Sequence, residues 1–318
     1  MKKACIYTGI VTALLCLVSC GGKEQPAARD SHRDAAGWER FDLSEYCSIY
    51  SMQFPSAGPG WAAGEHGRIY ERSGTGWKKG TLPVGEQIFS LSFPKRNRGF
   101  GVGSAGTVLS FRNGIWTPVE LDVFWDIMDI FFISEHEGWA VGENSIILHY
   151  TSSGWKTEWK TQAAPTIGYL TRVFFTGADN GWAVGNNGLI LHYDGSDWSQ
   201  ADSPTGENLY GVSFPEKGRG WAVGAFGTIL HFRNNTWRTC DSPVENHLLD
   251  IHFISGTQGW IVGASGVVLS LQQGRWREIE SPSQKALYAV ATDTSGNLWI
   301  AGKGGKIYKK TIAGGSAR

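Results

Sequence analysis

The sequence predicts an all-β fold, a seven-bladed β-propeller with four antiparallel strands in each blade. Three observations predict it: a GW-type dipeptide recurs about every 40 residues, a second tryptophan follows at a fixed spacing, and glycine and β-branched residues crowd the units. A period near 40 residues is typical of propellers and solenoid arrays. A helical solenoid is the alternative, but no 3.6-residue pattern persists along these units, which favours strands.

The repeat can be counted from three aromatic positions. The first is the aromatic residue of the GW dipeptide, and its spacing is 39 residues in every interval except one of 43. These residues are Trp61, Phe100, Trp139, Trp182, Trp221, Trp260 and Trp299. The second position follows 16 residues later, at Trp77, Trp116, Trp155, Trp198, Trp237 and Trp276. The third precedes the GW aromatic by seven residues, at Phe54, Phe93, Phe132, Phe175, Phe214 and Phe253, with Thr292 in the last unit.

Each unit contains four short segments with strand character, bounded by turn residues. In the fifth unit strand A is "NLYGVSF", strand B is "GWAVG", strand C is "TILHF" and strand D begins at "TWR". The links between them are short, as antiparallel hairpins require. One unit is therefore one blade, and seven blades closed into a ring leave no long sheet edge exposed.

The last unit lacks its strand D, because Gly315 stands where the second tryptophan is expected. Trp38 lies 16 residues before Phe54, the same spacing as from Trp77 to Phe93. We therefore expect Gly37 to Phe41 to pair with the C-terminal "KIYKK" and to close the seventh blade. This gives a propeller over 37–310 and a C-terminal tail over 311–318.

The N-terminus has the three parts of a secretory signal: two lysines, a short apolar run and a small residue before Cys20. Leu17, Val18, Ser19 and Cys20 resemble the lipobox of bacterial lipoproteins, which implies a signal peptide over 1–19 and a lipid on Cys20. The polar residues that follow, with Cys20, form a flexible tether over 20–36. The expected location is the bacterial cell envelope, with the propeller outside the cytoplasm; an ordinary signal peptide or an uncleaved anchor is the alternative.

Composition and motifs exclude several partners. The chain has 29 basic and 29 acidic residues, so it lacks the basic excess with which nucleic-acid binders attract phosphate. The segment "GVGSAG" matches a dinucleotide fingerprint formally, but that motif must open a helix, and a strand follows here. It is predicted to be a hairpin turn, so no nucleotide and no other cofactor is expected.

Cysteines and histidines do not predict a metal site. After the signal and the lipidation site, Cys47 and Cys240 remain, and the repeat places them in distant blades as two free thiols. His149, His192 and His231 share one position in strand C of three blades. Strand C lies toward the rim, where blades diverge, so these side chains should not converge on a metal ion.

The repeat resembles the BNR-like and photosystem II assembly factor family of propellers. The residues that carry the resemblance in the fourth unit are the "GWAVG" strand (181–185), Gly188, the following strand (189–193) and the turn before Trp198. The resemblance covers about residues 37–310 and implies the fold rather than a function. The related sialidase Asp-box survives only as "DGSDW", where its Asp and Gly shape a turn.

A binding site is predicted at the face where the D–A connections and the B–C turns lie. Trp125 and Trp159 do not fit the tryptophan register, and Trp159 lies in a four-residue insertion expected in the D–A connection after the third blade. Loops on a rigid scaffold commonly carry function. The candidate residues are Glu86, Trp125, Asp126, Trp159, Tyr169, Glu207, Asn208, His247 and Lys285. Scattered surface residues with no common ligand are the alternative.

Three polar residues are expected deeper in the channel, at Asp129, Arg172 and Asp250. A salt-bridge network is the favoured interpretation, and Asp129 and Asp250 as the acid and base of a glycosidase are the alternative. On the opposite face, "PKRNRG" and "PEKGRG" are read as solvated turns, with a weak patch for an acidic partner as the alternative.

The sequence therefore predicts a non-catalytic, membrane-anchored lipoprotein that binds an envelope protein or a glycan through the D–A face. The family resemblance adds a role in the assembly of a membrane complex. A sialidase-like glycan-cleaving enzyme and a surface adhesin are the alternatives.

Overall fold

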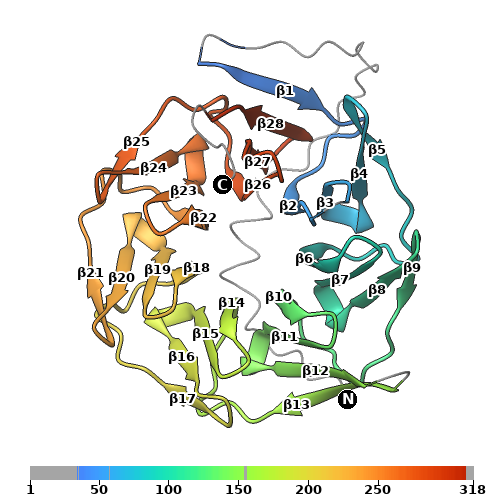
Figure 1. Ribbon diagram of the computed structural model, residues 1–318, viewed down its shortest axis with the longest axis vertical. Coiled ribbons are helices and arrows are strands. Elements are labelled where there is room, and N and C mark those ends of the chain that lie inside the picture. The colour runs from blue at the N-terminus through green and yellow to red at the C-terminus, as the bar shows by residue number, and fades with distance from the viewer. Residues whose placement is uncertain (1–33, 35, 57, 154–155, 313–318) are drawn as a thin grey trace, which may run out of the picture. The chain divides into compact units, whose positions relative to one another are not determined.

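The computed structural model describes residue 34 and residues 36–56, 58–153 and 156–312. In these residues 28 strands form seven four-stranded antiparallel sheets. Figure 1 shows the sheets as blades of a ring, and the innermost strands contact one another in sequence until β26 meets β2. The predicted seven-bladed propeller is confirmed. The predicted signal peptide, Cys20, most of the tether, Trp155 and most of the C-terminal tail lie outside the described residues.

The first four blades each run outward from strand A to strand D. Blade one contains β2 (Ile49–Gln53), β3 (Trp61–Gly64), β4 (Ile69–Ser73) and β5 (Gly76–Lys79). Blade two contains β6 (Ile88–Lys95), β7 (Arg98–Gly103), β8 (Val108–Arg112) and β9 (Ile115–Pro118). Blade three contains β10 (Ile127–Ser134), β11 (Glu137–Gly142), β12 (Ile147–Ser153) and β13 (Lys156–Gln162). Blade four contains β14 (Leu170–Gly177), β15 (Asn180–Gly185), β16 (Ile190–Tyr193) and β17 (Trp198–Gln200).

The remaining three blades follow the same plan. Blade five contains β18 (Leu209–Glu216), β19 (Arg219–Gly224), β20 (Ile229–Arg233) and β21 (Thr236–Thr239). Blade six contains β22 (Leu248–Ser255), β23 (Gln258–Gly263), β24 (Val268–Gln272) and β25 (Arg275–Glu278). Blade seven contains β26 (Leu287–Thr292), β27 (Leu298–Gly302), β28 (Lys306–Lys310) and β1 (Trp38–Asp42). Three-residue 3-10 turns join strands B and C in blades one to six; they are Glu65–Gly67, Ser104–Gly106, Glu143–Ser145, Asn186–Gly188, Ala225–Gly227 and Ala264–Gly266.

The N-terminal strand closes the ring as predicted. β1 pairs antiparallel with β28, with Trp38 opposite Lys310 and Phe41 opposite Ile307. Trp38 is only 1% exposed, packs in the core between blades six and seven, and donates its indole N–H to the carbonyl oxygen of Glu280 at 3.1 Å. The two ends of the propeller are therefore held in one sheet.

Aromatic stacking joins each blade to the next. The strand B ring of one blade lies against the strand A phenylalanine of the following blade, as in Trp61 on Phe93 at 5.4 Å and Trp139 on Phe175 at 3.8 Å between ring centroids. The strand D tryptophan of the following blade meets the first ring edge-on, as Trp116 meets Trp61. The predicted role of the repeated aromatics as core between blades is confirmed.

Within the part of the chain that the structure describes, no helix is long and apolar enough to span a lipid bilayer.

Substitution Trp38→Ala tests the closure. Removal of a fully buried tryptophan leaves a cavity in the sheet that joins the two ends, so we expect unfolding in urea to show a loss of about 3–5 kcal/mol. Arg40→Ala is the matched control, since Arg40 lies on the same strand with an exposed side chain and should cost about 0–1 kcal/mol. Equal urea midpoints for the two variants would show that β1 does not hold the ring closed.

Candidate functional site

The D–A connections and the B–C turns lie together at one end of every blade. The first residue of each turn donates its backbone N–H to the residue just before strand A of the same blade, as from Glu143 to the carbonyl oxygen of Asp126 at 2.9 Å and from Asn186 to that of Tyr169 at 3.0 Å. We call this surface the mouth face. It comprises the B–C turns and the connections 43–48, 80–87, 119–126, 163–169, 201–208, 240–247 and 279–286.

Three of the predicted site residues hold the turn of the preceding blade. Asp126 Oδ1 accepts the backbone N–H of Ala105 at 2.8 Å, Asn208 Oδ1 that of Asn187 at 2.9 Å, and His247 Nδ1 that of Phe226 at 3.2 Å. Each donor residue has a positive φ near 50°, which costs energy for a residue with a side chain. These side chains therefore have a structural role between blades.

Neighbouring blades also approach closely at the third residue of the turn. Gly106 has φ +72°, and a Cβ placed on it would lie 1.9 Å from the carbonyl oxygen of Val123 in the next connection. Only glycine fits there. The turn of blade two and the connection to blade three are thus in direct contact.

The other predicted residues of the mouth face are more exposed. Trp125 is 50% exposed, Glu86 and Lys285 are exposed, and Glu207 is half-buried. Lys285 Nζ lies 5.2 Å from the ring centroid of Tyr46. Tyr169 is half-buried and its hydroxyl donates to Met128 Sδ at 2.9 Å. Burial, followed by the nearby carboxylates of Glu143 and Asp126, raises the pKa of Tyr169.

The prediction that Trp159 lies on the mouth face is wrong. Trp159 stands opposite Tyr150 on β13, as Trp198 stands opposite Tyr193 in blade four, and it packs edge-on against Phe100 and Phe132. The four-residue insertion therefore lies in the C–D hairpin and not in the D–A connection. The spacing of 16 residues between Trp159 and Phe175, the usual one from strand D to the next strand A, is the signal that identifies it.

A β-bulge at the start of strand A presents residues that the sequence reasoning missed. The pairing of strands A and B shifts register at the same position in all seven blades, four residues before the phenylalanine position. Bulges commonly re-aim a side chain. The bulged residues of blades seven, one and two form an aromatic cluster, with Tyr50 5.5 Å from Tyr288 and 5.9 Å from Phe89 between ring centroids.

Exposed apolar side chains concentrate on the mouth face. Of the seven large hydrophobic residues that are exposed among the described residues, five lie there: Tyr46, Phe124, Trp125, Ile167 and Phe226. The other two are Ile115 in a C–D hairpin and Ile254 at the opposite end of blade six. Exposed apolar side chains that gather on one face indicate an interaction site rather than chance exposure.

The mouth face is also strongly acidic, although the whole chain has no net charge. The connections and turns carry only three permanent cations, Arg68, Lys285 and Lys303. Their carboxylates are Glu45, Glu65, Glu86, Glu120, Asp122, Asp126, Glu143, Asp202, Glu207, Asp241, Glu245 and Glu280. Such a face attracts cationic groups and repels anionic ones.

The three predicted channel residues form one buried network. Arg172 Nη1 lies 3.5 Å from Asp129 Oδ1, and Arg172 Nη2 lies 3.0 Å from Asp250 Oδ1. Asp129 Oδ1 also accepts from Ser90 Oγ at 2.6 Å. Burial raises the pKa of both carboxyls above the ordinary value, and Arg172 opposes that rise. The predicted ion pair between Asp129 and Arg172 is present.

The same carboxylates join neighbouring innermost strands. Asp129 Oδ2 accepts the backbone N–H of Val173 at 2.8 Å, and Asp250 Oδ2 accepts that of Val290 at 2.9 Å. Both oxygens of each carboxylate thus have partners within the wall of the channel. The geometry fits a structural network better than the acid and base of a glycosidase, whose carboxylates must face the substrate.

Three further motifs have structural roles. The "GVGSAG" segment forms the predicted hairpin turn between β7 and β8. In "DGSDW", Asp194 Oδ1 accepts the backbone N–H groups of Asp197 and Ser196, and these hydrogen bonds lower the pKa of Asp194 to about 2. Cys47 and Cys240 are free thiols in different blade interfaces, as predicted.

The three strand C histidines each stack on the strand B tryptophan of their own blade. The ring centroids are 4.4 Å apart for His149 and Trp139, 4.3 Å for His192 and Trp182, and 4.0 Å for His231 and Trp221. No group of three or more metal-ligating side chains gathers among the described residues.

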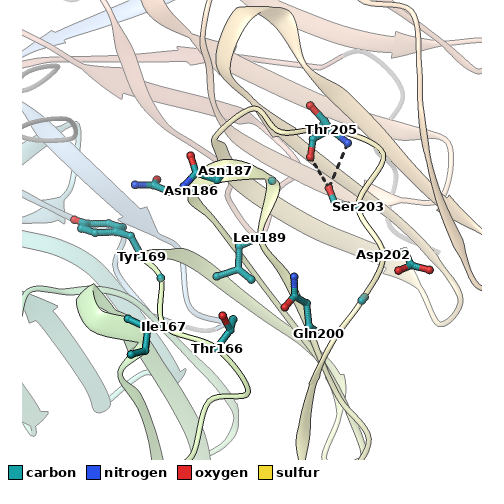
Figure 2. Close-up of a pocket in the computed structure, with 13 residues that line it drawn as sticks. Thr166, Ile167, Tyr169, Asn186, Asn187, Leu189, Gln200, Asp202, Ser203 and Thr205 are labelled. Carbon is teal, nitrogen blue, oxygen red and sulfur yellow. Dashed lines mark hydrogen bonds between the residues drawn. The ribbon is translucent and has the colours of Figure 1, made fainter.

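A pocket of about 650 Å³ opens on the mouth face at blade four. Figure 2 shows its lining, which comes from connection 163–169, the turn at Asn186, the end of β17 and connection 201–208. Amides and hydroxyls dominate, with Asp202 as the one carboxylate and no basic side chain. The side-chain oxygen of Asn186 is buried and has no hydrogen-bond partner among the described residues.

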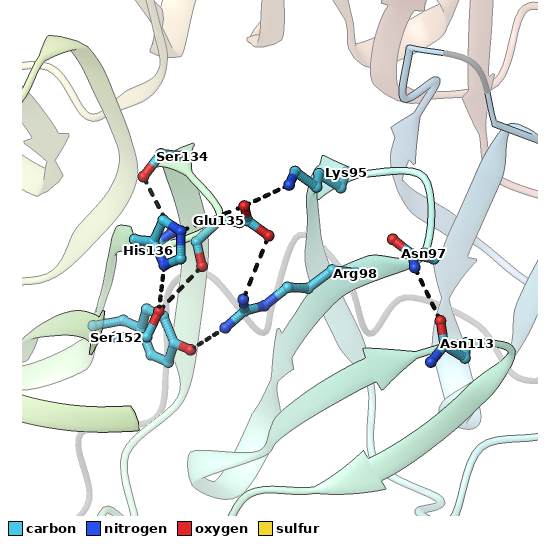
Figure 3. A network of polar contacts seen from close by, with 9 residues as sticks. Lys95, Asn97, Arg98, Asn113, Ser134, Glu135, His136 and Ser152 are labelled. Carbon is cyan, nitrogen blue, oxygen red and sulfur yellow. Dashed lines mark hydrogen bonds and ion pairs between the residues drawn. The ribbon is translucent and has the colours of Figure 1, made fainter. Parts of the chain in front are cut away.

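On the opposite face, the basic residues of "PKRNRG" are neutralised by the next blade. Glu135, between β10 and β11, pairs with both Lys95 and Arg98, and Arg98 Nη2 donates to the hydroxyl of Tyr150 at 2.5 Å (Figure 3). His136 completes the network through Ser152 Oγ at 3.0 Å. These cations are already paired, which weakens the alternative of an acidic partner here.

The ring of four-stranded blades, with its GW strands and acidic mouth face, defines this chain as a seven-bladed repeat propeller. Residues 110–202 match the model of the family described as photosynthesis system II assembly factor YCF48. The resemblance to assembly-factor-like propellers is therefore confirmed. No curated protein matches the chain by sequence.

Solved structures share the fold over most of their length. A structure of YCF48 bound to D1 peptide is 21% identical with a TM-score of 0.74, covering 88% of this chain and 98% of the other. YCF48 from Cyanidioschyzon merolae is 17% identical, with a TM-score of 0.72 and coverage of 86% and 99%. A streptogramin B lyase is also 17% identical, with a TM-score of 0.77 and coverage of 87% and 99%. At these identities the similarity concerns the fold alone.

Substitution Arg172→Met tests the channel network. It leaves two buried carboxylates without a cation, so we expect a loss of about 3–5 kcal/mol at neutral pH. Without Arg172 the pKa values of Asp129 and Asp250 rise further, and a carboxyl with a raised pKa in the folded state stabilises the fold only while it is protonated. The loss should therefore shrink in mildly acidic buffer, as measured by urea unfolding.

Arg40→Met, which removes an exposed ion pair with Asp42, is the control. It should cost about 0–1 kcal/mol with little dependence on pH. A loss for Arg172→Met that is equal in acidic and alkaline buffer would contradict the assignment of the carboxylates as buried partners of Arg172.

Proposed function

We propose that this chain is a lipid-anchored protein of the bacterial envelope whose propeller binds a protein partner through the mouth face. The observation that carries the proposal is the concentration of exposed apolar side chains there, at Tyr46, Phe124, Trp125, Ile167 and Phe226. A closed ring of blades holds these loops in fixed positions, so a partner that binds them pays little for ordering them.

The fold supports a scaffold role. One structure with the same fold, that of YCF48, was solved with a D1 peptide bound, so a propeller of this kind can bind a polypeptide segment. By analogy we propose that the partner is a subunit of a membrane complex, held during its assembly. A photosynthetic role does not follow, because the repeat resemblance concerns the fold.

The lipid anchor is proposed from the sequence. The apolar run is followed by Leu17, Val18, Ser19 and Cys20, and the residues up to about 36 would form a tether between lipid and propeller. A surface adhesin would have the same anchor and differ only in where its partner resides.

A glycan is the second candidate ligand, and the blade-four pocket favours it. Its amide and hydroxyl groups, with Asp202 and no base, suit the hydrogen bonds of a neutral sugar. Cleavage of a glycan by Asp129 and Asp250 is the less favoured proposal, because both carboxylates are bound to Arg172 and to backbone N–H groups.

Capture from solubilised envelopes tests the protein-binding proposal. We expect the wild-type chain to retain one envelope protein, identified by mass spectrometry, and the double variant Phe124→Ser, Trp125→Ser to lose it. Ile115→Ser is the control, because Ile115 is 66% exposed but lies in a C–D hairpin away from the mouth face. Retention of the same proteins by all three forms would count against the mouth face. Retention of none would make a glycan array with the blade-four pocket the next test.

Substitution Cys20→Ala tests the anchor. We expect it to abolish incorporation of a labelled fatty acid and to release the propeller from the membrane fraction, because the lipid is then the only membrane attachment. Cys47→Ala is the matched control and should keep the label. Membrane retention of Cys20→Ala without label would favour an uncleaved N-terminal anchor.

A further inference from the structure

The blade-three patch is the part of the mouth face whose chemistry specifies a partner most closely. We define it as Phe124, Trp125, Asp126, Glu143 and Ile167. Phe124 is 81% exposed, Trp125 50% and Ile167 85%. The inference rests on the proposed function, since it concerns what the partner presents to this face.

Backbone contacts make these residues one continuous surface. Glu143 and Asp126 exchange two contacts, from the Glu143 N–H to the Asp126 carbonyl oxygen at 2.9 Å and from the Asp126 N–H to Glu143 Oε2 at 3.3 Å. On the other side of the same turn, the Ser145 N–H donates to the carbonyl oxygen of Gly168 at 2.8 Å, next to Ile167. Two carboxylates therefore lie between the exposed aromatic pair and the exposed isoleucine.

The two carboxylates lack a cation. Within the part of the chain that the structure describes, neither Asp126 nor Glu143 forms an ion pair, whereas Glu45 on the same face pairs with Arg68 and Lys79. Connection 119–126, "VELDVFWD", contains three carboxylates and no basic residue, and connection 163–169 contains no charge. Burial raises the pKa of Glu143, and the charge of Asp126 adds to the rise although a backbone hydrogen bond opposes it. A cation bound here would relieve this repulsion.

We propose that the blade-three patch binds an extended segment of the partner protein in which lysine or arginine side chains alternate with apolar ones. The cation would lie against Asp126 and Glu143 and over the ring of Trp125, where carboxylates and an aromatic face attract it together. The apolar residues of the segment would cover Phe124 and Ile167, which gives the burial that anchors an interface. Acidic segments are excluded by the same charges.

Two labelled peptides of equal length test the proposal. They share the same apolar residues, and every charged position is arginine in one and glutamate in the other. Fluorescence anisotropy with the detergent-solubilised full chain should show the arginine peptide binding at least about tenfold more tightly, with affinity falling as salt rises. The double variant Phe124→Ser, Trp125→Ser should weaken binding about tenfold or more.

Neutral amides separate charge from structure. Asp126→Asn and Glu143→Gln keep the side-chain oxygens that accept the N–H groups of Ala105 and Asp126 but remove both charges. This variant should lose the preference for arginine and most of the salt dependence. The matched control is Glu158→Gln with Asp197→Asn, which removes two charges at the outer strands and hairpins and should bind as the wild type does.

Each outcome decides the proposal separately from the proposed function. Equal binding of both peptides, equal loss in the control variant, or no binding of the arginine peptide would overturn it. If the capture experiment then still retains a partner that Phe124→Ser, Trp125→Ser loses, the protein-binding function stands and its partner is not basic. If capture fails as well, both proposals fail.

Discussion

The stack of a strand B aromatic ring on the phenylalanine of the next blade holds the propeller together, because neighbouring blades belong to separate sheets and share no ladder of hydrogen bonds. A four-stranded sheet alone has two exposed faces, and it buries them only against the next blade. The period of the sequence follows from this requirement. Each unit must supply the same large ring at the same place, and so tryptophan recurs at one spacing. The same requirement explains why Trp38 lies at the far end of the chain from its blade: the ring is complete only when blade seven has its fourth strand.

Polar side chains form a second set of contacts between blades, and this set explains why several predicted site residues are structural. Near the channel, Asp129 and Asp250 each bind a backbone N–H of the next innermost strand; at the mouth, Asp126, Asn208 and His247 each hold the turn of the preceding blade. A polar residue that stands out of a repeat looks like a ligand in the sequence. In a ring, the same residue can instead satisfy a backbone group where two blades meet and no ladder is available.

The sequence predicts the fold well because the period, the turns and the closing strand all express short-range constraints. The site is predicted less well, for three physical reasons. Trp159 was assigned by counting from strand B, but the insertion lies in the C–D hairpin and counting to Phe175 gives the true register. The bulge that presents Tyr50, Phe89 and Tyr288 depends on pairing, which alternation along one strand does not reveal. The exposure of Phe124 and Ile167 depends on what the neighbouring blades cover.

Function in such a ring depends on the residues that the repeat leaves free, and charge shows this most clearly. The chain has as many basic as acidic residues, which suggests no preference between partners of either sign. The fold separates them: the mouth face gathers carboxylates, whereas Lys95 and Arg98 at the other end are already neutralised by Glu135. Since opposite charges at opposite ends of a rigid ring cannot cancel at close range, each face presents its own field to a partner. The mouth face combines an unpaired negative field with exposed rings, and this combination, rather than the fold, limits what the propeller can bind.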